Sequence, residues 1–320
     1  MATLAGVFGM THSPFCYMPP ERWNEVRASR ALRADVPSDD VETNRAKWQR
    51  IQAAFGALRA RLAAVAPDAL VVFGDDQLEC FDFTNFPSFA VYVGDGFTGA
   101  LSTGAMTRVA GHREIAVALL TGLMQRGFDP AFSMEMPKPD RGIGHAFLRP
   151  AESLTDLGVP IVPVFVNCYY APQPTGLRCY QLGRAVREIL AELPGRLRIA
   201  VVGSGGLWHT PRAQDAHLDE TFDRAVLDCA VRGDARGMAA HFDAYAPPPG
   251  DRSQDAGARG QGITGMPAPG GPRGGTRETC NWIAAAAAAP DGARAEVVDY
   301  VPVYASPIGA AFAHWPPDGR

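Results

Sequence analysis

The chain lacks the sequence features of membrane, exported and nucleic-acid-binding proteins. Its 320 residues contain no long basic block, and 30 basic against 34 acidic residues give a formal net charge of -4, so nucleic acid is not an expected partner. No uninterrupted apolar stretch reaches membrane-spanning length, and residues 1–15 have neither the positive start nor the apolar core of a signal peptide. We therefore expect a cytoplasmic protein without a membrane partner.

Cysteine pairs and nucleotide-binding motifs are also missing. No CxxC pair occurs, and scattered cysteines in a chain of this length are expected to be reduced and buried rather than joined in a disulfide framework. They are Cys16, Cys80, Cys168, Cys179, Cys229 and Cys280. The stretch "GSGG" at 203–206 fits neither GxGxxG nor GxxxxGK[ST], so a phosphate cradle is not expected. A tight turn that brings His209 near a small substrate explains it better.

Apolar strands and amphipathic helices alternate along the chain, which predicts an α/β fold. The clearest helix starts at Asp40 and ends before Pro67, because its apolar residues recur at steps of three and four. Strands are predicted at 3–9, 69–73, 88–94, 160–170, 197–202 and, as the last one, 295–304. Further helices are predicted at 112–126, 176–193, 218–232, 234–243 and 277–289, with a short turn at 152–157.

Residues 246–275 are rich in Pro, Gly and Arg and almost lack large apolar side chains. Because only residues 276–320 follow, this composition predicts a mobile loop within a single catalytic domain of residues 1–320, not a linker between domains. Such a loop could act as a lid that excludes water from a site. A disordered excursion without that role fits the composition equally well.

Side chains able to bind metal or move protons follow the predicted strand 69–73. The sequence "GDDQLE" at 74–79 places two aspartates, a glutamine and a glutamate directly after a glycine turn. Strand ends are where α/β enzymes commonly keep their chemistry. This stretch is therefore a candidate part of an active site.

Three histidines stand in similar places. His12 follows the first predicted strand in "GMTHSP", His145 lies in "RGIGHAF", and His209 lies in "GSGGLWHTP". Any one of them alone is more often a structural histidine. Together with "GDDQLE" they could converge on one face of a sheet, and imidazole is a common ligand for Fe or Zn and a common acid or base near neutral pH.

A carboxylate stands at the start of a late predicted helix, in "GGTRETCNW" at 274–282. Thr276 can cap this helix, which puts Glu278 in its first turn. The side chain could simply complement the helix dipole. It could also be a metal ligand that follows directly on a flexible loop.

Four motifs occur in the order "THSP", "PDALVVFGDDQ", "GHAF" and "VVGSGGLWHTP", and a glutamate follows on a late helix. This arrangement resembles that of the class III extradiol ring-cleavage dioxygenases. These are relatives of the catalytic beta subunit of protocatechuate 4,5-dioxygenase, and the 3-O-methylgallate or gallate type is the most similar subgroup. The resemblance covers nearly the whole chain. It implies a single large domain with a central mixed β-sheet flanked by helices, and a homodimer as the assembly.

The resemblance also implies a reaction and a set of site residues. The family opens catecholic or gallate-like rings with O2 at an Fe(II) held by two histidines and a glutamate. By position, His12 and Glu278 correspond to metal ligands. His209 corresponds to the acid/base histidine, and His145 to a histidine that contacts substrate or oxygen.

The second metal histidine is replaced in this chain, because Gln77 stands at its position. The Gln77 amide oxygen could take its place. Alternatively Asp76 or Glu79 could supply a carboxylate, or iron chemistry could have been lost. An oxygen-rich ligand set shifts the metal preference toward Mn or another divalent ion, although Fe(II) stays compatible.

Two other functions compete with ring cleavage. An altered metal site could support a non-oxidative hydrolase or lyase, and the same fold could serve as a non-catalytic binding protein. Candidates for binding a substrate carboxylate are Tyr169, Tyr170, Arg273 and Arg277.

Overall fold

The structure is a computed structural model that describes residues 1–210, 212–249, 266 and 269–317. Eight strands of this part of the chain form one sheet with the order β6-β3-β7-β2-β8-β1-β10-β9. In chain order they are β1 (Thr3–Met10), β2 (Ala69–Gly74), β3 (Phe89–Tyr92), β6 (Ala131–Ser133), β7 (Ile161–Val166), β8 (Arg198–Ser204), β9 (Glu296–Val303) and β10 (Ile308–Trp315). A separate hairpin consists of β4 (Gly96–Ala100) and β5 (Met106–Ala110).

The sheet is mixed, as the family resemblance implies. Strands β7, β2, β8 and β1 are parallel neighbours, whereas β10 and β9 pair antiparallel at one edge and β3 pairs antiparallel with β7. The carboxyl ends of the four parallel strands lie at the same edge of the sheet. That edge is where an α/β fold gathers its functional side chains.

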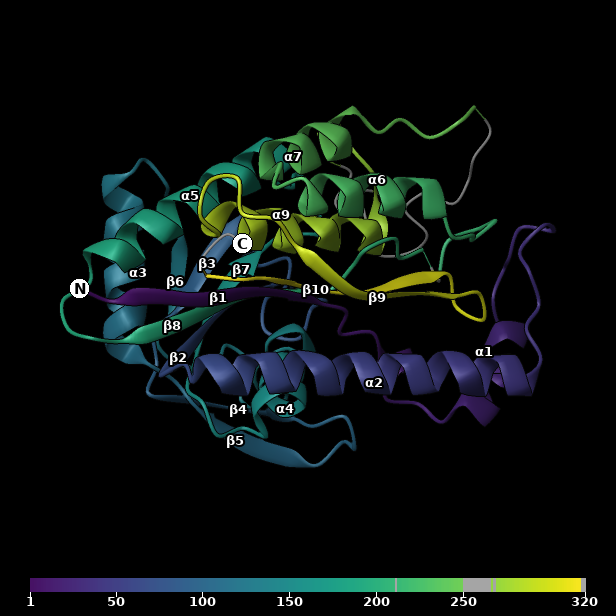
Figure 1. Cartoon of the computed structure of the whole chain (residues 1–320), viewed down its shortest axis with the longest axis horizontal. Coiled ribbons are helices and arrows are strands. Elements are labelled where there is room, and N and C mark those ends of the chain that lie inside the picture. The colour runs from purple at the N-terminus through teal and green to yellow at the C-terminus, as the bar shows by residue number, and fades with distance from the viewer. Residues whose placement is uncertain (211, 250–265, 267–268, 318–320) are drawn as a thin grey trace.

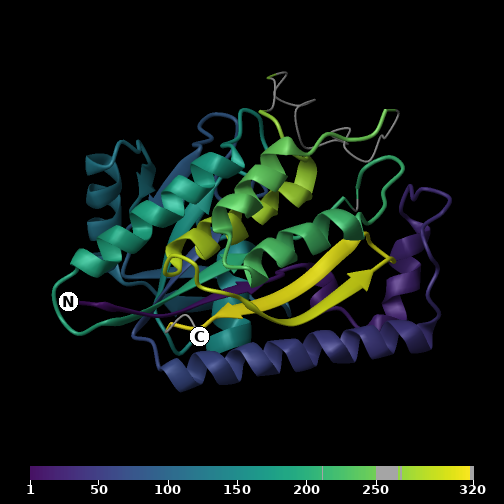
Figure 2. The ribbon, with the colours of Figure 1, turned by 45° about the horizontal axis from the view of Figure 1, so that its top comes forward.

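Helices cover both faces of the sheet (Figure 1). One face carries α3 (Arg113–Gln125), α5 (Gly176–Glu192), α6 (Glu220–Val231), α7 (Ala235–Ala244) and α9 (Thr279–Ala288). The other face carries α2 (Val41–Val65), which runs along the sheet in Figure 2, together with α1 (Trp23–Ala28) and α4 (His145–Thr155). Short 3-10 helices span Pro14–Cys16, Pro20–Arg22 and Gly274–Glu278.

The burial of β2 explains why its sequence is apolar throughout. Val71 and Phe73 belong to the hydrophobic cluster beneath α5 and α9, whereas Leu70 and Val72 belong to the cluster beneath α2 and α4. Because side chains alternate across a strand, a strand covered on both faces needs apolar residues at every position. This burial holds the end of β2, and the polar residues that follow it, in a fixed place.

Most predicted elements agree with the structure to within a few residues, but two predictions are wrong. Residues 295–304 are not the last strand, because β10 follows and pairs with both β9 and β1. Its alanine-rich sequence is a weak strand signal that tertiary pairing overrides. Residues 152–157 are not an isolated turn, because α4 already begins at His145; Pro150 inside this helix obscured its pattern. The strands β4, β5 and β6 were not predicted.

All six cysteines are free and buried, as expected. Among the helices that the structure describes, none is long and apolar enough to cross a membrane. Most of the predicted mobile loop at 246–275 lies outside the described residues.

Candidate metal centre

Three buried side chains meet at the carboxyl edge of the parallel strands. They are His12 after β1, Asp75 after β2, and Glu278 just before α9, and their ligand atoms all lie within 4.8 Å of one another. Nε2 of His12 is 3.4 Å from Oε2 of Glu278 and 3.9 Å from Oδ1 of Asp75. Segments far apart in the sequence thus bring one imidazole and two carboxylates together.

The imidazole of His12 is oriented by a hydrogen bond on its far side. Nδ1 lies 3.0 Å from Oγ of Ser204, which leaves Nε2 facing the two carboxylates. Burial lowers the pKa of His12 to about 3, so the ring is neutral at physiological pH. A neutral imidazole with one nitrogen held by a neighbour is the form that binds metal ions.

The two carboxylates have different surroundings. Oε2 of Glu278 accepts the Gly206 N–H at 2.8 Å, and its Oε1 accepts the Tyr169 hydroxyl. Although burial raises the pKa of Glu278, His12 and His209 outweigh it and hold that pKa below its ordinary value. Burial, with repulsion from Glu278, raises the pKa of Asp75 well above its ordinary value.

A divalent cation fits this arrangement. Among the described residues, Nε2 of His12 and Oδ2 of Asp75 are buried without a hydrogen-bond partner, and buried polar atoms are rarely left in that state. Two buried carboxylates also repel each other unless a cation lies between them. The donor set of one nitrogen and two carboxylates suits several divalent metals.

The backbone of Gly205 passes very close to two of the candidate ligands. A Cβ atom on Gly205 would lie 2.6 Å from Oε2 of Glu278 and 2.9 Å from Cε1 of His12, and the residue has a φ of +111°. Only glycine meets both conditions. Gly205, the second glycine of "GSGG", therefore makes room for the candidate ligands.

The structure brings Asp75, not Asp76, into the cluster. The Asp76 carboxylate instead accepts the backbone N–H groups of Glu79, Cys80 and Phe81 at 2.6 to 3.2 Å, and burial raises its pKa to about 6. Asp75 is not among the predicted ligands, because the position of the family's histidine points to Gln77 and its neighbour Asp76. The available signal was that Asp75 follows β2 most closely.

Gln77 lies beside the cluster but is turned toward a tyrosine. Its Nε2 donates to the hydroxyl of Tyr169 at 2.9 Å. Tyr169, which follows β7, is one of the candidates for binding a substrate carboxylate. Its hydroxyl joins Gln77 to Glu278, and burial raises its pKa well above the ordinary value.

The structure brings His209 and His145 to the same place. Nδ1 of His209 lies 3.6 Å from Oε2 of Glu278, and its backbone N–H donates to Oγ1 of Thr276 at 3.0 Å. The ring of His145, at the start of α4, stands edge-on to the ring of His12 with centroids 4.7 Å apart. The catalytic roles of both histidines stay predictions.

Arg277, one of the candidates for binding a substrate carboxylate, is bonded to backbone carbonyls instead. It is fully buried, and its guanidinium donates to the carbonyls of Gly270, Pro272 and Pro174 at 2.6 to 3.2 Å. These bonds tie the segment before Glu278 to the segment after β7. Arg277 therefore holds Glu278 in position through the backbone.

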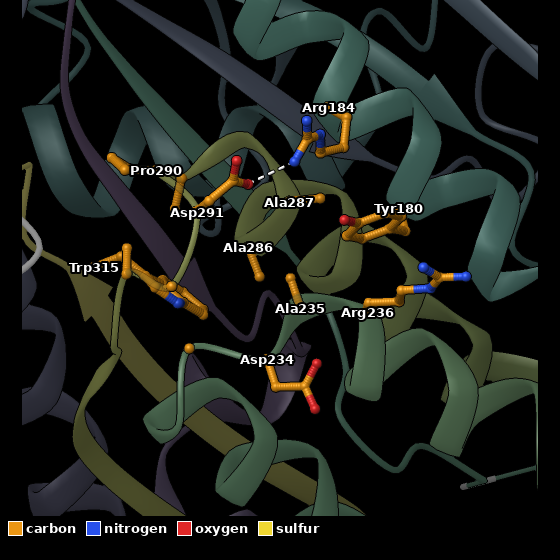
Figure 3. A pocket seen from close by; sticks show the side chains of 14 residues that line it. Tyr180, Arg184, Asp234, Ala235, Arg236, Ala286, Ala287, Pro290, Asp291 and Trp315 are labelled. Carbon is orange, nitrogen blue, oxygen red and sulfur yellow. Dashed lines mark hydrogen bonds and ion pairs between the residues drawn. The ribbon is translucent and has the colours of Figure 1, made fainter.

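A separate pocket lies between α5, α7 and α9 (Figure 3). Its lining includes Tyr180, Arg184, Asp234 and Trp315. Arg184 forms an ion pair there with Asp291. None of its lining residues belongs to the cluster. We assign it no part in the chemistry.

Bacterial enzymes named as dioxygenases are similar in sequence to this chain. The chain is 34% identical over 211 residues to a 2,3-dihydroxyphenylpropionate/2,3-dihydroxicinnamic acid 1,2-dioxygenase of Comamonas testosteroni, covering 63% of this chain and 55% of the relative. It is 31% identical over 191 residues to the enzyme of that name from Klebsiella pneumoniae (strain 342), covering 56% of each. The chain thus spans about half the length of the curated relatives it matches.

One solved structure, of an uncharacterized protein from Escherichia coli K12, matches with a TM-score of 0.47 and 11% identity, over 82% of this chain and 91% of that one. Residues 34–244 match the family model described as the catalytic LigB subunit of aromatic ring-opening dioxygenase. This range includes Asp75, His145 and His209 but not His12 or Glu278. The chain therefore belongs to the LigB family of aromatic ring-opening dioxygenases, which confirms the resemblance to class III extradiol enzymes.

Proposed function

We propose that this protein is a metal-dependent extradiol dioxygenase, which opens a catecholic or gallate-like aromatic ring with O2. The observation that carries the proposal is the cluster of His12, Asp75 and Glu278, with His145 and His209 beside it. Five separate segments contribute these side chains, and family membership gives them a common chemistry. The relatives' names suggest a further substrate, a 2,3-dihydroxylated phenylpropionate.

The metal ligands of this proposal are His12, Asp75 and Glu278. When bound there, a divalent metal would supply a Lewis acid and a template for the two ring oxygens and O2. Two carboxylates make the ligand set more anionic and harder than two histidines and a glutamate. Fe(II) is the metal of the proposal, with Mn(II) as the alternative that this ligand set favours.

His209 is the proposed general base. Its backbone is held by Thr276, its Nδ1 lies near Glu278, and its side chain is 11% exposed. Nε2 would take a proton from a substrate hydroxyl, since imidazole is suited to proton transfer near neutral pH. His145, whose ring stands edge-on to the ring of His12, would form a hydrogen bond with the substrate or with O2.

The replacement of the second histidine keeps a second function open. A more anionic metal site could serve hydrolysis or C–C bond cleavage without oxygen, and a binding protein would not need any turnover. Oxygen consumption separates these alternatives, because only the dioxygenase couples ring opening to O2.

The test is to purify the protein anaerobically, load it separately with Fe(II) and Mn(II), and measure bound metal and oxygen uptake. The substrates are catechol, gallate, 3-O-methylgallate and 2,3-dihydroxyphenylpropionate. We expect about one metal per chain and uptake that requires both metal and a diol. The matched control is His209→Gln, which should keep the metal and lose uptake. Metal-loaded protein that consumes no oxygen with any substrate would refute the proposal.

A further inference from the structure

Glu79 and His145 form a close pair at the edge of the candidate metal centre. Nδ1 of His145 lies 2.8 Å from Oε1 and 2.9 Å from Oε2 of Glu79. Oε1 also lies 3.2 Å from the backbone nitrogen of His145, whose N–H it accepts. One carboxylate therefore holds both the ring of His145 and the start of α4.

The loop that carries Glu79 is built to hold this carboxylate in place. The Asp76 side chain accepts the N–H of Glu79 at 2.6 Å, and Leu78 has the left-handed φ of +67°. Lys138 and Arg141 both donate to the carbonyl of Leu78 at 3.3 Å. A left-handed leucine is costly and persists only where its surroundings enforce it. The loop therefore directs Glu79 toward His145 at a cost in strain.

The residue that precedes α4 also leaves room for the carboxylate of Glu79. Gly144 precedes His145, and a Cβ atom there would lie 2.8 Å from Oε2 of Glu79. Even an alanine side chain would push the carboxylate away. The loop that carries Glu79 and the glycine before α4 are therefore both suited to the close approach of the Glu79 carboxylate to His145.

The hydrogen bond decides which ring nitrogen faces the site. A carboxylate accepts the proton on Nδ1, so Nε2 is the nitrogen left for another partner. Among the described residues, Nε2 has no hydrogen-bond partner and is not among the buried unpaired atoms. The ring is edge-on to His12 at 4.7 Å, and the side chain is 19% exposed. Nε2 is therefore accessible beside the candidate ligands.

We propose that Glu79 is a positioning residue for His145, which fixes the ring through Nδ1 and presents Nε2 to the substrate at the metal centre. The substrate part rests on the proposed function. The inference also removes Glu79 from the candidates for the missing metal ligand, since His145 occupies both of its oxygens. Glu79 would thus act on turnover and not on metal binding.

The test compares Glu79→Ala and Glu79→Gln with Glu152→Gln in the metal-loaded protein. Glu152 is the matched control because it also lies on α4, where it accepts hydrogen bonds from Ser102 and Arg149. We expect Glu79→Ala to lower kcat by about tenfold to a hundredfold with KM and bound metal unchanged. Glu79→Gln, whose amide oxygen can still accept from Nδ1, should recover part of this loss. Glu152→Gln should keep the kcat of the wild-type protein.

A spectroscopic measurement tests the positioning without turnover. In metal-free protein with 15N-labelled histidine, long-range 1H–15N spectra distinguish a proton on Nδ1 from one on Nε2, and His145→Gln assigns the signals. We expect the Nδ1–H form of His145 in the wild-type protein and a shift toward the Nε2–H form in Glu79→Ala. An unchanged spectrum, an unchanged kcat or loss of metal in Glu79→Ala would each overturn the inference. Wild-type protein without turnover but with the Nδ1–H signal would contradict the proposed function only.

Discussion

The hydroxyl of Tyr169 donates a hydrogen bond to Oε1 of Glu278, and the hydroxyl oxygen of Tyr169 in turn accepts one from Nε2 of Gln77 at 2.9 Å. Gln77 stands where the family's second metal histidine is expected, and in this chain it touches the candidate metal centre through Tyr169. Groups that hydrogen-bond to a metal carboxylate set its orientation. Gln77 thus contributes to the site by holding the hydroxyl of Tyr169 through a hydrogen bond.

The first prediction concerns this support. Tyr169→Phe removes the hydrogen bond to Glu278, so the affinity for the metal should fall by about tenfold or more. Competition against a chromophoric chelator measures the affinity. Tyr17→Phe is the control, because it also removes one tyrosine hydroxyl, bonded to Ser153 at 2.8 Å. Equal affinities in the two variants would contradict the role of Tyr169.

The second prediction separates the candidate ligands. Asp75→Ala removes a direct ligand and should abolish metal binding, whereas Gln77→Ala should retain the metal with a loss of affinity of about tenfold. Metal content after gel filtration, together with chelator titration, distinguishes the two. The opposite result would make Gln77 the ligand. Bound metal should also raise the melting temperature of the wild-type protein and not that of Asp75→Ala.

The third prediction concerns the glycine turn beside the cluster. Gly205→Ala should lose metal binding, because the new Cβ would lie 2.6 Å from Oε2 of Glu278. Gly195→Ala is the control: it has a similar φ of +93° but no heavy atom within 4 Å of the added Cβ. Both variants should be destabilised by about 1–3 kcal/mol from backbone strain alone, as urea unfolding would measure. A Gly205→Ala protein with normal metal content would show that the ligands lie elsewhere.

The fourth prediction concerns the pH dependence of stability and a carboxyl group outside the candidate metal centre. Burial raises the pKa of Asp223 from 3.8 to about 8, so between these two pH values the folded protein binds more protons than the unfolded chain. Stability from this group is therefore lost as the pH rises through that window, with a slope of at most about 1.4 kcal/mol per pH unit. Urea unfolding from pH 5 to 8 measures this slope.

Asp223→Asn is the reference for this measurement. The asparagine can accept from the Trp208 N–H, which Asp223 accepts at 2.7 Å, and can donate to the hydroxyl of Tyr300. It cannot titrate, so the free energy of unfolding should depend less on pH in the variant than in the wild-type protein. Parallel pH profiles would mean that Asp223 keeps an ordinary pKa.

The residue types of the site were predictable from sequence because their positions follow local signals. His12 and His209 stand after strand or glycine-turn signals, and Glu278 stands at a helix start; all three meet in the structure. The apolar runs that form β2, β7 and β8 are likewise visible without the fold. Burial on both faces leaves only apolar residues suitable there.

The roles within "GDDQLE" were not predictable in this way. Asp75 belongs to the candidate metal centre, Asp76 binds backbone N–H groups, Gln77 binds Tyr169, and Glu79 binds His145. The directions in which these side chains point depend on the left-handed backbone conformation of Leu78 and on contacts with residues 138–145. No periodic pattern encodes such contacts.

By itself, the sequence determined the α/β class, the order of most strands and helices, and the kinds of side chain available for chemistry, because these depend on local periodicity and on turn residues. Only the tertiary structure decided which carboxylate joins His12 and Glu278, which one holds His145, and that β10 completes the sheet beside β1. The physical reason is that these contacts join residues up to 308 positions apart in the sequence, as in the pairing of Val7 in β1 with Trp315 in β10. Their energies depend on three-dimensional approach, which local sequence does not specify.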